Sequence, residues 1–270
     1  MQERFVSSLI LGSSVAAAGY GIATIAVLLR LFQEKGPNLV FILCAASAAI
    51  LGHSLAINHS IFASEINFAL SNVVSLVNLV ITIAITLIAL KYKINLLLPV
   101  AYGFACFWQL LSLLVPSIHE VPLAVTDPYI YSHITLSLLS YCILVIGTMY
   151  AFQVAYINHK LKEKNLLAVS HLPPLMQVES QLFVILAVGT LCLVISQLTG
   201  FLFLADLFSK DNAHKTVLSL ISLLVYLAIL LGHYRFGWRG HRVLVLTLVA
   251  TGLLTMAYFG SRFVKEFLLS

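Results

Sequence analysis

Residues 214–242 read HKTVLSLISLLVYLAILLGHYRFGWRGHR. This stretch is an apolar run ending in a short polar loop, and similar apolar runs separated by short loops make up the rest of the chain. It opens with a histidine and a lysine, continues as a mostly apolar run, and closes in a short loop with three arginines. About twenty apolar residues in a helix span the roughly 30 Å hydrocarbon core of a bilayer. The stretch therefore predicts a transmembrane helix followed by a basic loop.

The same pattern predicts eight transmembrane helices. The 270 residues are 61% hydrophobic and 9% charged, with a mean hydropathy of +1.03, which is typical of a polytopic membrane protein. No connection is long enough for a soluble domain, so we predict one all-α transmembrane domain over residues 1–270. The first apolar run is too long for a signal-peptide core, and we expect it to be retained. The predicted helices cover 5–30, 39–58, 66–90, 95–115, 131–157, 180–204, 214–234 and 243–262.

Positive charge is concentrated in the loops on one side of the predicted bundle. Ten of the fifteen Lys and Arg follow the first, third, fifth and seventh helices. By the positive-inside rule these loops face the cytoplasm, and an even number of helices then places both termini outside, in the periplasm. The distribution predicts a bacterial inner membrane protein in contact with lipid, with no nucleic-acid partner. The ten residues are Arg30, Lys35, Lys91, Lys93, Lys160, Lys162, Lys164, Arg235, Arg239 and Arg242.

Two histidines, His133 and His214, each lie near the start of a predicted helix on the outer side. Ionisable groups in such positions are costly and rarely idle. Paired imidazoles near a bilayer surface can hold a haem iron from both axial sides. We therefore predict His133 and His214 as haem-iron ligands, with His53 and His233 as weaker candidates. The alternative for each is an ordinary interfacial or hydrogen-bonded histidine.

Other side chains near the predicted outer site suit an anionic porphyrin. Lys215 adjoins the second histidine, and Arg262 closes the eighth helix on the same side. Tyr258 lies four residues before Arg262 and so shares its helix face. The two cations would pair with haem propionates, and the tyrosine would cover the macrocycle. Snorkelling at a helix end is the alternative for both cations.

Polar side chains and cysteines inside the spans give two further expectations. One face of the third helix carries Asn67, Ser71, Ser75 and Asn78, either as interhelical hydrogen-bonding groups or as the wall of a polar cavity in the outer half of the membrane. In the second case, the sixth helix would face the same cavity with Ser196, Gln197 and Thr199. The four cysteines form no Cys-x-x-Cys pair and are expected to be small core residues. Paired carboxylates on a helix, nucleophile motifs and phosphate-binding glycine loops are missing from the sequence. We therefore predict no catalytic residue and no enzyme.

The second half of the chain resembles the cytochrome c assembly membrane proteins (CcsA/CcmC-like), in their HemX-like and YpjD-like branch. The resemblance rests on SHITLSLLSYCILVIGTMYAFQ around His133, LPPLMQVESQLF at 172–183 and TGFLFLADLF at 199–208. It continues through the opening stretch at 214–240 and AYFGSRFV at 257–264. Residues 130–265 carry most of it, and the first four helices follow it more loosely.

This resemblance implies an eight-helix fold that handles haem b. In the family, two outward-facing histidines flank a tryptophan-rich WWD loop, and His133 and His214 match those two positions. The loop itself does not match, because residues 205–213 read ADLFSKDNA and the chain has only Trp108 and Trp238. The surface that would present haem to an apoprotein is therefore missing, and haem ligase activity is not expected.

Two functions from different classes remain open at this point. The first is a non-enzymatic haem-binding protein that assists cytochrome c maturation or haem homeostasis. The second is a structural or regulatory membrane subunit without haem, which works with another membrane protein in a complex related to divalent-cation transport. The histidine pair separates them, because only the first function needs it. A small-molecule transporter is a third, weaker alternative.

Overall fold

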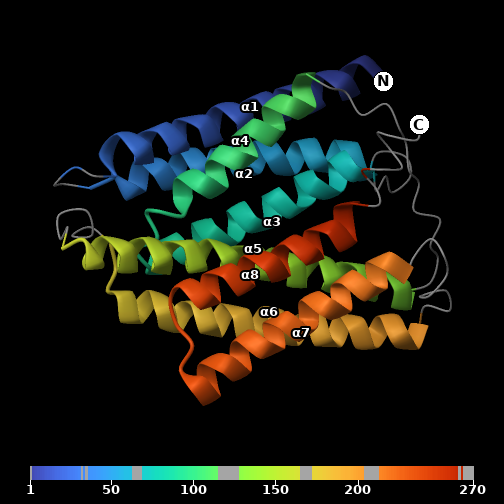
Figure 1. Cartoon of the computed structure of the whole chain (residues 1–270). Helices are drawn as coiled ribbons and strands as arrows, with labels where there is room; N and C mark the ends of the chain where they lie inside the picture. The colour runs from blue at the N-terminus through green and yellow to red at the C-terminus, as the bar shows by residue number, and fades with distance from the viewer. Residues whose placement is uncertain are drawn as a thin grey trace. The chain divides into compact units, whose positions relative to one another are not determined.

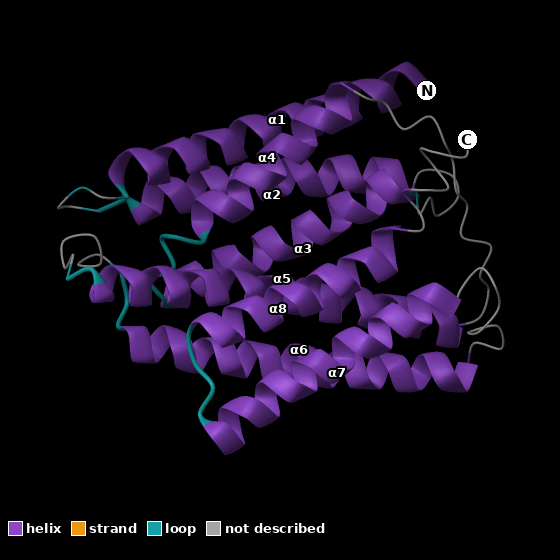
Figure 2. Ribbon diagram, viewed as in Figure 1, coloured by secondary structure: helices purple, strands orange, loops and turns teal. Residues whose placement is uncertain are grey.

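The computed structural model describes residues 2–31, 33, 36–62, 69–114, 128–164, 172–203, 213–260 and 263. Within these ranges the regular structure is entirely helical, so the predicted all-α class is confirmed (Figure 2). Apolar helices are expected in a bilayer, where every backbone N–H and C=O must be bonded inside its own segment. The helices are α1 Gln2–Arg30, α2 Leu39–Phe62, α3 Leu70–Lys91, α4 Leu98–Leu114, α5 Pro128–Lys162, α6 Leu175–Phe203, α7 Ala213–Phe236 and α8 His241–Thr255.

Seven of these eight helices are long and apolar enough to cross a membrane. The remaining one, α4, has 17 residues and a length of about 25 Å, a few ångströms short of a typical hydrocarbon core. The prediction of a polytopic membrane protein is therefore confirmed. Helix boundaries differ by a few residues from those predicted. The largest difference is at α8, which ends at Thr255 rather than at residue 262, because the π-helical turn Met256–Gly260 follows it. α6 begins at Leu175 rather than at residue 180, since Pro173 and Pro174 precede its first turn.

The chain divides into two compact units of four helices (Figure 1). Unit 1 comprises residues 1–124 and 166–173, and unit 2 comprises residues 125–165 and 174–270. In unit 1, α1 packs on α2 and α4, and α3 packs on the same two helices. In unit 2, α5 packs on α6 and α8, and α7 packs on the same two helices. Each unit is thus a closed ring of four helices. That the whole chain forms one domain stays a prediction.

Small residues bring the helices of unit 1 close together. A Cβ atom added to Gly12 of α1 would lie 2.8 Å from the carbonyl oxygen of Gly52 in α2. One added to Gly19 would lie 2.8 Å from the Cβ of Ala49, so larger side chains cannot be placed at either position without moving a helix. Membrane helices use such small-residue contacts because lipid offers little hydrophobic drive for their association.

The interior of unit 1 is polar at its centre. His53 of α2 is fully buried, with its Nδ1 3.3 Å from the Tyr20 hydroxyl of α1 and its Nε2 2.9 Å from the Ser75 hydroxyl of α3. Tyr20 also bonds Thr82 of α3 at 3.0 Å. Gln109 of α4 donates to Ser75 at 3.5 Å. The polar face predicted for the third helix is therefore an interhelical hydrogen-bonding face at Ser75.

Unit 2 is built around an antiparallel pair, α5 and α6. Gly147 of α5 lies against Leu186 of α6, and Gly189 of α6 lies against Leu144 of α5. Ser140 donates to the carbonyl oxygen of Gly189 at 3.0 Å, so a hydroxyl joins the two helices in the middle of this contact. The glycines alternate between the helices, and each accepts a leucine from its partner.

The cysteines depart in part from the sequence-based expectation. All four are free, and Cys142 is buried as expected. Cys44 of α2, however, is exposed, and Cys106 and Cys192 are half-buried. A membrane protein has an apolar exterior as well as an apolar core, so hydropathy alone does not distinguish a lipid-facing cysteine from a packed one.

Candidate functional site

Four of the predicted site residues lie at one end of unit 2, namely His133, His214, the adjacent Lys215 and Tyr258. His133 is on the second turn of α5, His214 is the second residue of α7, and Tyr258 lies in the π-helical turn Met256–Gly260 that follows α8. The start of α5 and the end of α6 meet at this end because the two helices are antiparallel. We call it the His133 end of unit 2. Arg262, a predicted propionate partner, lies outside the described residues.

The His133 imidazole is held by the last turns of α6. Its Nδ1 lies 2.9 Å from the carbonyl oxygen of Ser196 and 3.3 Å from the hydroxyl of Thr199. The Thr199 hydroxyl itself donates to the Ser196 carbonyl at 2.8 Å. A carbonyl oxygen only accepts, so Nδ1 carries the proton and donates it there. Nε2 is then the nitrogen with the free lone pair, which is the form of imidazole that binds a metal.

Gly200 makes room for this imidazole. A Cβ atom at this position would lie 2.9 Å from Cε1 of His133 and 3.3 Å from its Nδ1. The ring therefore packs directly on the backbone of α6, one turn beyond the carbonyl that it bonds. Orientation and tautomer of His133 are both determined by α6.

A serine next to the histidine connects three helices. Ser137 donates to the carbonyl oxygen of His133 at 2.7 Å and bonds the Ser196 hydroxyl at 2.5 Å. It is also hydrogen-bonded to the Tyr258 hydroxyl. A serine hydroxyl has one donor and two acceptor sites, so with its own proton used on the carbonyl it accepts from Ser196 and from Tyr258. The bonding capacity of Ser137 is then complete.

The π-helical turn that carries Tyr258 directs two aromatic rings toward α5. Tyr141 lies with its ring centroid 5.8 Å from that of Tyr258 and 5.2 Å from that of Phe259. Its hydroxyl bonds Thr255, the last residue of α8, at 3.0 Å. Single π-helical turns within or at the ends of helices are frequent at functional sites, because they redirect side chains that an α-helix would place elsewhere.

His214 and Lys215 lie in the first turn of α7, at the His133 end of unit 2. His214 is exposed, and the described part of the chain offers it no hydrogen-bond partner. Lys215 is half-buried. It lies four residues before Ser219 and seven before Ser222, two buried serines of α7, and so belongs to the helix face that packs into unit 2.

The two weaker candidates differ from His133 in their surroundings. His53 belongs to unit 1, and both of its ring nitrogens bond protein hydroxyls, as described above. His233 lies near the other end of α7, about 29 Å along the helix from His214. Its ring stacks on Phe183 with centroids 3.3 Å apart, and its Nδ1 donates to the Trp238 carbonyl at 3.2 Å.

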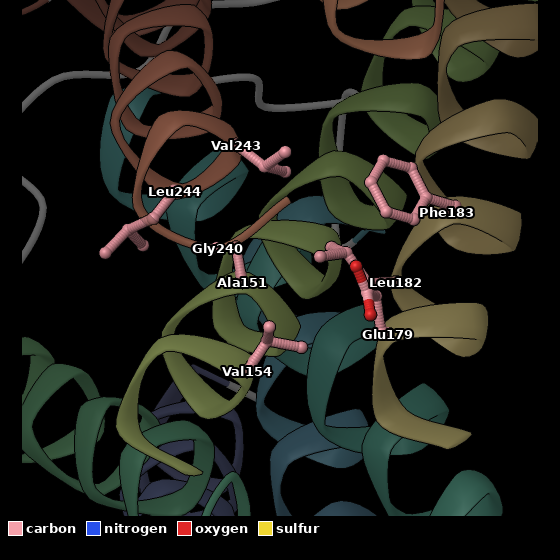
Figure 3. Close-up of a pocket in the computed structure, with 8 residues that line it drawn as sticks. All are labelled: Ala151, Val154, Glu179, Leu182, Phe183, Gly240, Val243 and Leu244. Carbon is pink, nitrogen blue, oxygen red and sulfur yellow. The ribbon is translucent and has the colours of Figure 1, made fainter. Parts of the chain in front are cut away.

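A small pocket lies near His233, at the end of unit 2 away from His133. It is a narrow indentation of about 200 Å³, including the part open to the surroundings, with no room for a water molecule, and it is lined by residues of α5, α6 and the start of α8, among them Glu179 and Phe183 (Figure 3). Glu179 is 8% exposed, with one carboxylate oxygen 3.2 Å from Nε of Arg239. That atom pair is close enough for an ion pair but is not aligned as a hydrogen bond. The pair connects α6 to the loop between α7 and α8.

Sequence reasoning did not connect His133 with the residues that position it. Ser137 lies one turn after the histidine, which is a local signal that could have been noticed. Ser196 and Gly200 lie 63 and 67 residues away along the chain, and Ser196 contributes a backbone carbonyl, which no side-chain pattern can reveal. Only the antiparallel contact of α5 with α6 brings them to the imidazole.

The chain matches one family of known proteins and is similar to individual bacterial proteins. The Cytochrome C assembly protein family matches residues 41–269. An inner membrane protein of Escherichia coli K12, YpjD, is 36% identical over 255 residues, covering 93% of this chain and 97% of that protein. An uncharacterized 28.8 kDa protein of Azospirillum brasilense is 32% identical over 143 residues, about half of each chain. No solved structure matches the chain.

Proposed function

Because the chain belongs to the cytochrome c assembly protein family, we propose that it binds haem b at the His133 end of unit 2 and handles it for cytochrome c maturation or haem homeostasis. Family membership supports a role in cytochrome c maturation or haem handling. His133 and His214 are the proposed axial ligands. The likeness to an inner membrane protein, together with the seven long apolar helices, supports a multi-pass protein of the bacterial inner membrane.

The observation that carries this proposal is the hydrogen bond from His133 to the Ser196 carbonyl. Metal-bound histidines nearly always donate their other ring N–H to a carbonyl, carboxylate or water, which sets the tautomer and makes the ligating nitrogen more basic. His133 has this partner in the Ser196 carbonyl, and its ring is held against Gly200. Its Nε2 is therefore prepared to bind iron.

The neighbouring residues fit the same ligand. Exposed His214 supplies a second imidazole at the same end, and Lys215 supplies a cation that suits a carboxylate of the porphyrin. Tyr258 adds an aromatic side chain held by Ser137. Arg262 remains a proposed propionate partner from the sequence. Imidazole, ammonium, guanidinium and aromatic side chains together suit an anionic, planar ligand better than a bare divalent cation.

We further propose that the protein is not an enzyme. The described residues near His133 are hydroxyls, aromatic rings and imidazoles, and the tryptophan-rich loop of the family does not occur in the sequence. A carrier or assembly factor needs only to bind and release haem. Besides lipid and haem, its partner would be another membrane protein of the maturation machinery.

The test is an absorption spectrum of the detergent-purified protein, both oxidised and reduced with dithionite, with a pyridine haemochrome assay for quantity. We expect a Soret band and sharp reduced α and β bands at about one haem per chain, as bis-histidine ligation requires. The His133→Ala and His214→Ala variants should each lose this spectrum. His241→Ala is the matched control, because His241 is exposed at the start of α8 and should leave the spectrum unchanged.

A variant that keeps a ligand protects the test against misfolding. His133→Met retains an axial donor, so it should keep haem while changing its spectrum and raising its reduction potential. If both alanine variants bind haem as the parent protein does, the ligand assignment is wrong. If the parent protein binds none, even after reconstitution with hemin, the non-haem subunit of a transport-related complex becomes the better hypothesis.

We also propose that both termini face the periplasm. The ends of α1 and α3 in unit 1 carry Arg30 and Lys91, and the ends of α5 and α7 in unit 2 carry Lys162 and Arg235, as the positive-inside rule requires of cytoplasmic ends. Alkaline phosphatase fused after Ser270 should therefore be active. An inactive phosphatase fusion together with a fluorescent C-terminal green fluorescent protein fusion would reverse the orientation.

A further inference from the structure

A groove opens on unit 1 between the end of α1 and the start of α2. It holds about 700 Å³, including the part open to the surroundings. Its described lining is Ala26, Leu29 and Arg30 of α1, Asn38 of the connection and Phe41 of α2. The groove has no part in the site proposed for haem, since all of its lining residues belong to unit 1.

The groove lies where a membrane meets water. Arg30 is the last residue of a candidate membrane span, and the next span begins at Leu39. Between them the chain reverses direction through Gly36, whose φ of +64° suits glycine. The headgroups of a bilayer lie at this depth, just beyond the hydrocarbon core.

One part of the groove is cationic. The Arg30 guanidinium is exposed and makes no ion pair with any residue that the structure describes. A guanidinium presents several N–H donors in a planar fork that matches phosphate. The described lining contains no carboxylate that would neutralise it. An anion is therefore the complementary ligand.

The start of α2 adds to this preference. The side-chain oxygen of Asn38 accepts from the Phe41 N–H at 3.3 Å, which caps one of the free amides of the first turn. The remaining amides of that turn and its partial positive charge belong to the helix start that contributes Asn38 and Phe41 to the lining of the groove. They support anion binding there, in addition to the arginine.

The walls of the groove are apolar. Leu29 is 69% exposed and Phe41 is 53% exposed, and both lie within or at the edge of a candidate span. A small soluble anion would gain no binding energy from these apolar walls, whereas an acyl chain would pack against them. A ligand with a phosphate at one end and hydrocarbon at the other matches the groove on both counts.

We propose that this groove binds an anionic phospholipid, with the headgroup phosphate on Arg30 and the start of α2 and an acyl chain along Leu29 and Phe41. A zwitterionic lipid fits less well, because its ammonium group would approach the same guanidinium. Lys91, which ends α3 at the same end of unit 1, adds to the positive field that attracts anionic lipid.

The experiment measures lipid binding by the full-length protein with native mass spectrometry from detergent. Phosphatidylglycerol and phosphatidylcholine of the same acyl chains are the two probes. We expect phosphatidylglycerol to bind at least about tenfold more tightly, and Arg30→Gln to remove most of that preference. Lys93→Gln is the matched control, since it removes one exposed basic charge outside the groove and should keep the preference.

Two further measurements keep the proposal falsifiable. Arg30→Lys keeps the charge but loses the fork, so it should show an intermediate preference even if the glutamine variant does not fold. Inorganic phosphate at millimolar concentration should not displace the lipid, because it cannot use the apolar walls. Equal loss of lipid in the Arg30→Gln and Lys93→Gln variants would overturn the proposal in favour of unspecific electrostatic attraction. Displacement of the lipid by inorganic phosphate would show that the groove binds the phosphate group alone and not a phospholipid.

Discussion

Replacing Gly200 with alanine tests the link between the packing of α6 and the proposed ligand His133. The new Cβ would lie 2.9 Å from Cε1 of the imidazole, closer than real Cβ contacts allow, and 3.3 Å from its Nδ1, which is tighter than most. The ring must move by several tenths of an ångström. That movement strains or breaks the 2.9 Å hydrogen bond to the Ser196 carbonyl.

The magnitude follows from three contributions. The lost hydrogen bond costs about 1 kcal/mol, and overpacking costs about 1–3 kcal/mol. Alanine returns about 1 kcal/mol through its better helix propensity. We therefore expect the free energy of unfolding to fall by about 1–3 kcal/mol. Haem affinity should fall about 10-fold to 100-fold, which is the usual effect of losing the partner that orients a metal ligand.

The assay is a hemin titration followed at the Soret band, together with thermal unfolding in the same detergent. Gly252→Ala is the matched control, because nothing lies within 4 Å of an added Cβ at that glycine of α8. It should bind haem normally and unfold no earlier than the parent protein. If the Gly200 variant behaves like this control in both measurements, the close packing of His133 on α6 is refuted. If it loses stability but binds haem normally, His133 is not an iron ligand.

Three other substitutions probe contacts within a single unit. Gly232→Ala would place a Cβ directly against the Trp238 ring and should lower the free energy of unfolding by about 3 kcal/mol or more in a denaturation experiment. An unchanged stability would show that the tryptophan moves freely. His53→Ala leaves the buried Tyr20 and Ser75 hydroxyls without their partner and should cost about 2–4 kcal/mol of stability. The haem spectrum should stay intact, and its loss in a normally folded variant would instead make His53 a ligand. Arg239→Gln leaves the Glu179 carboxylate unpaired and should lower the free energy of unfolding by about 1 kcal/mol. Adding Glu179→Gln should recover most of that loss, whereas additive losses in this double-mutant cycle would contradict the ion pair.

The sequence by itself determined the number, class and approximate ends of the helices that the structure describes. Backbone groups cannot be left unbonded in hydrocarbon, so an apolar run of sufficient length has to become a helix. The run from residue 213 to residue 236 illustrates this, since its predicted and observed ends agree within two residues. The repeated apolar runs, and the quoted resemblance to a family that handles haem, could be identified without coordinates.

Only the tertiary structure decided which helices share a unit and what each histidine contacts. His53 and His133 look alike in sequence, as single histidines in apolar helices, but one bonds two hydroxyls in unit 1 and the other donates to a backbone carbonyl in unit 2. Those partners are 22 to 63 residues away along the chain and include groups that every residue type carries. Helix propensity and hydropathy describe each segment alone. Pairing of helices depends on where small residues such as Gly200 let a neighbour approach, and that is a property of two surfaces together.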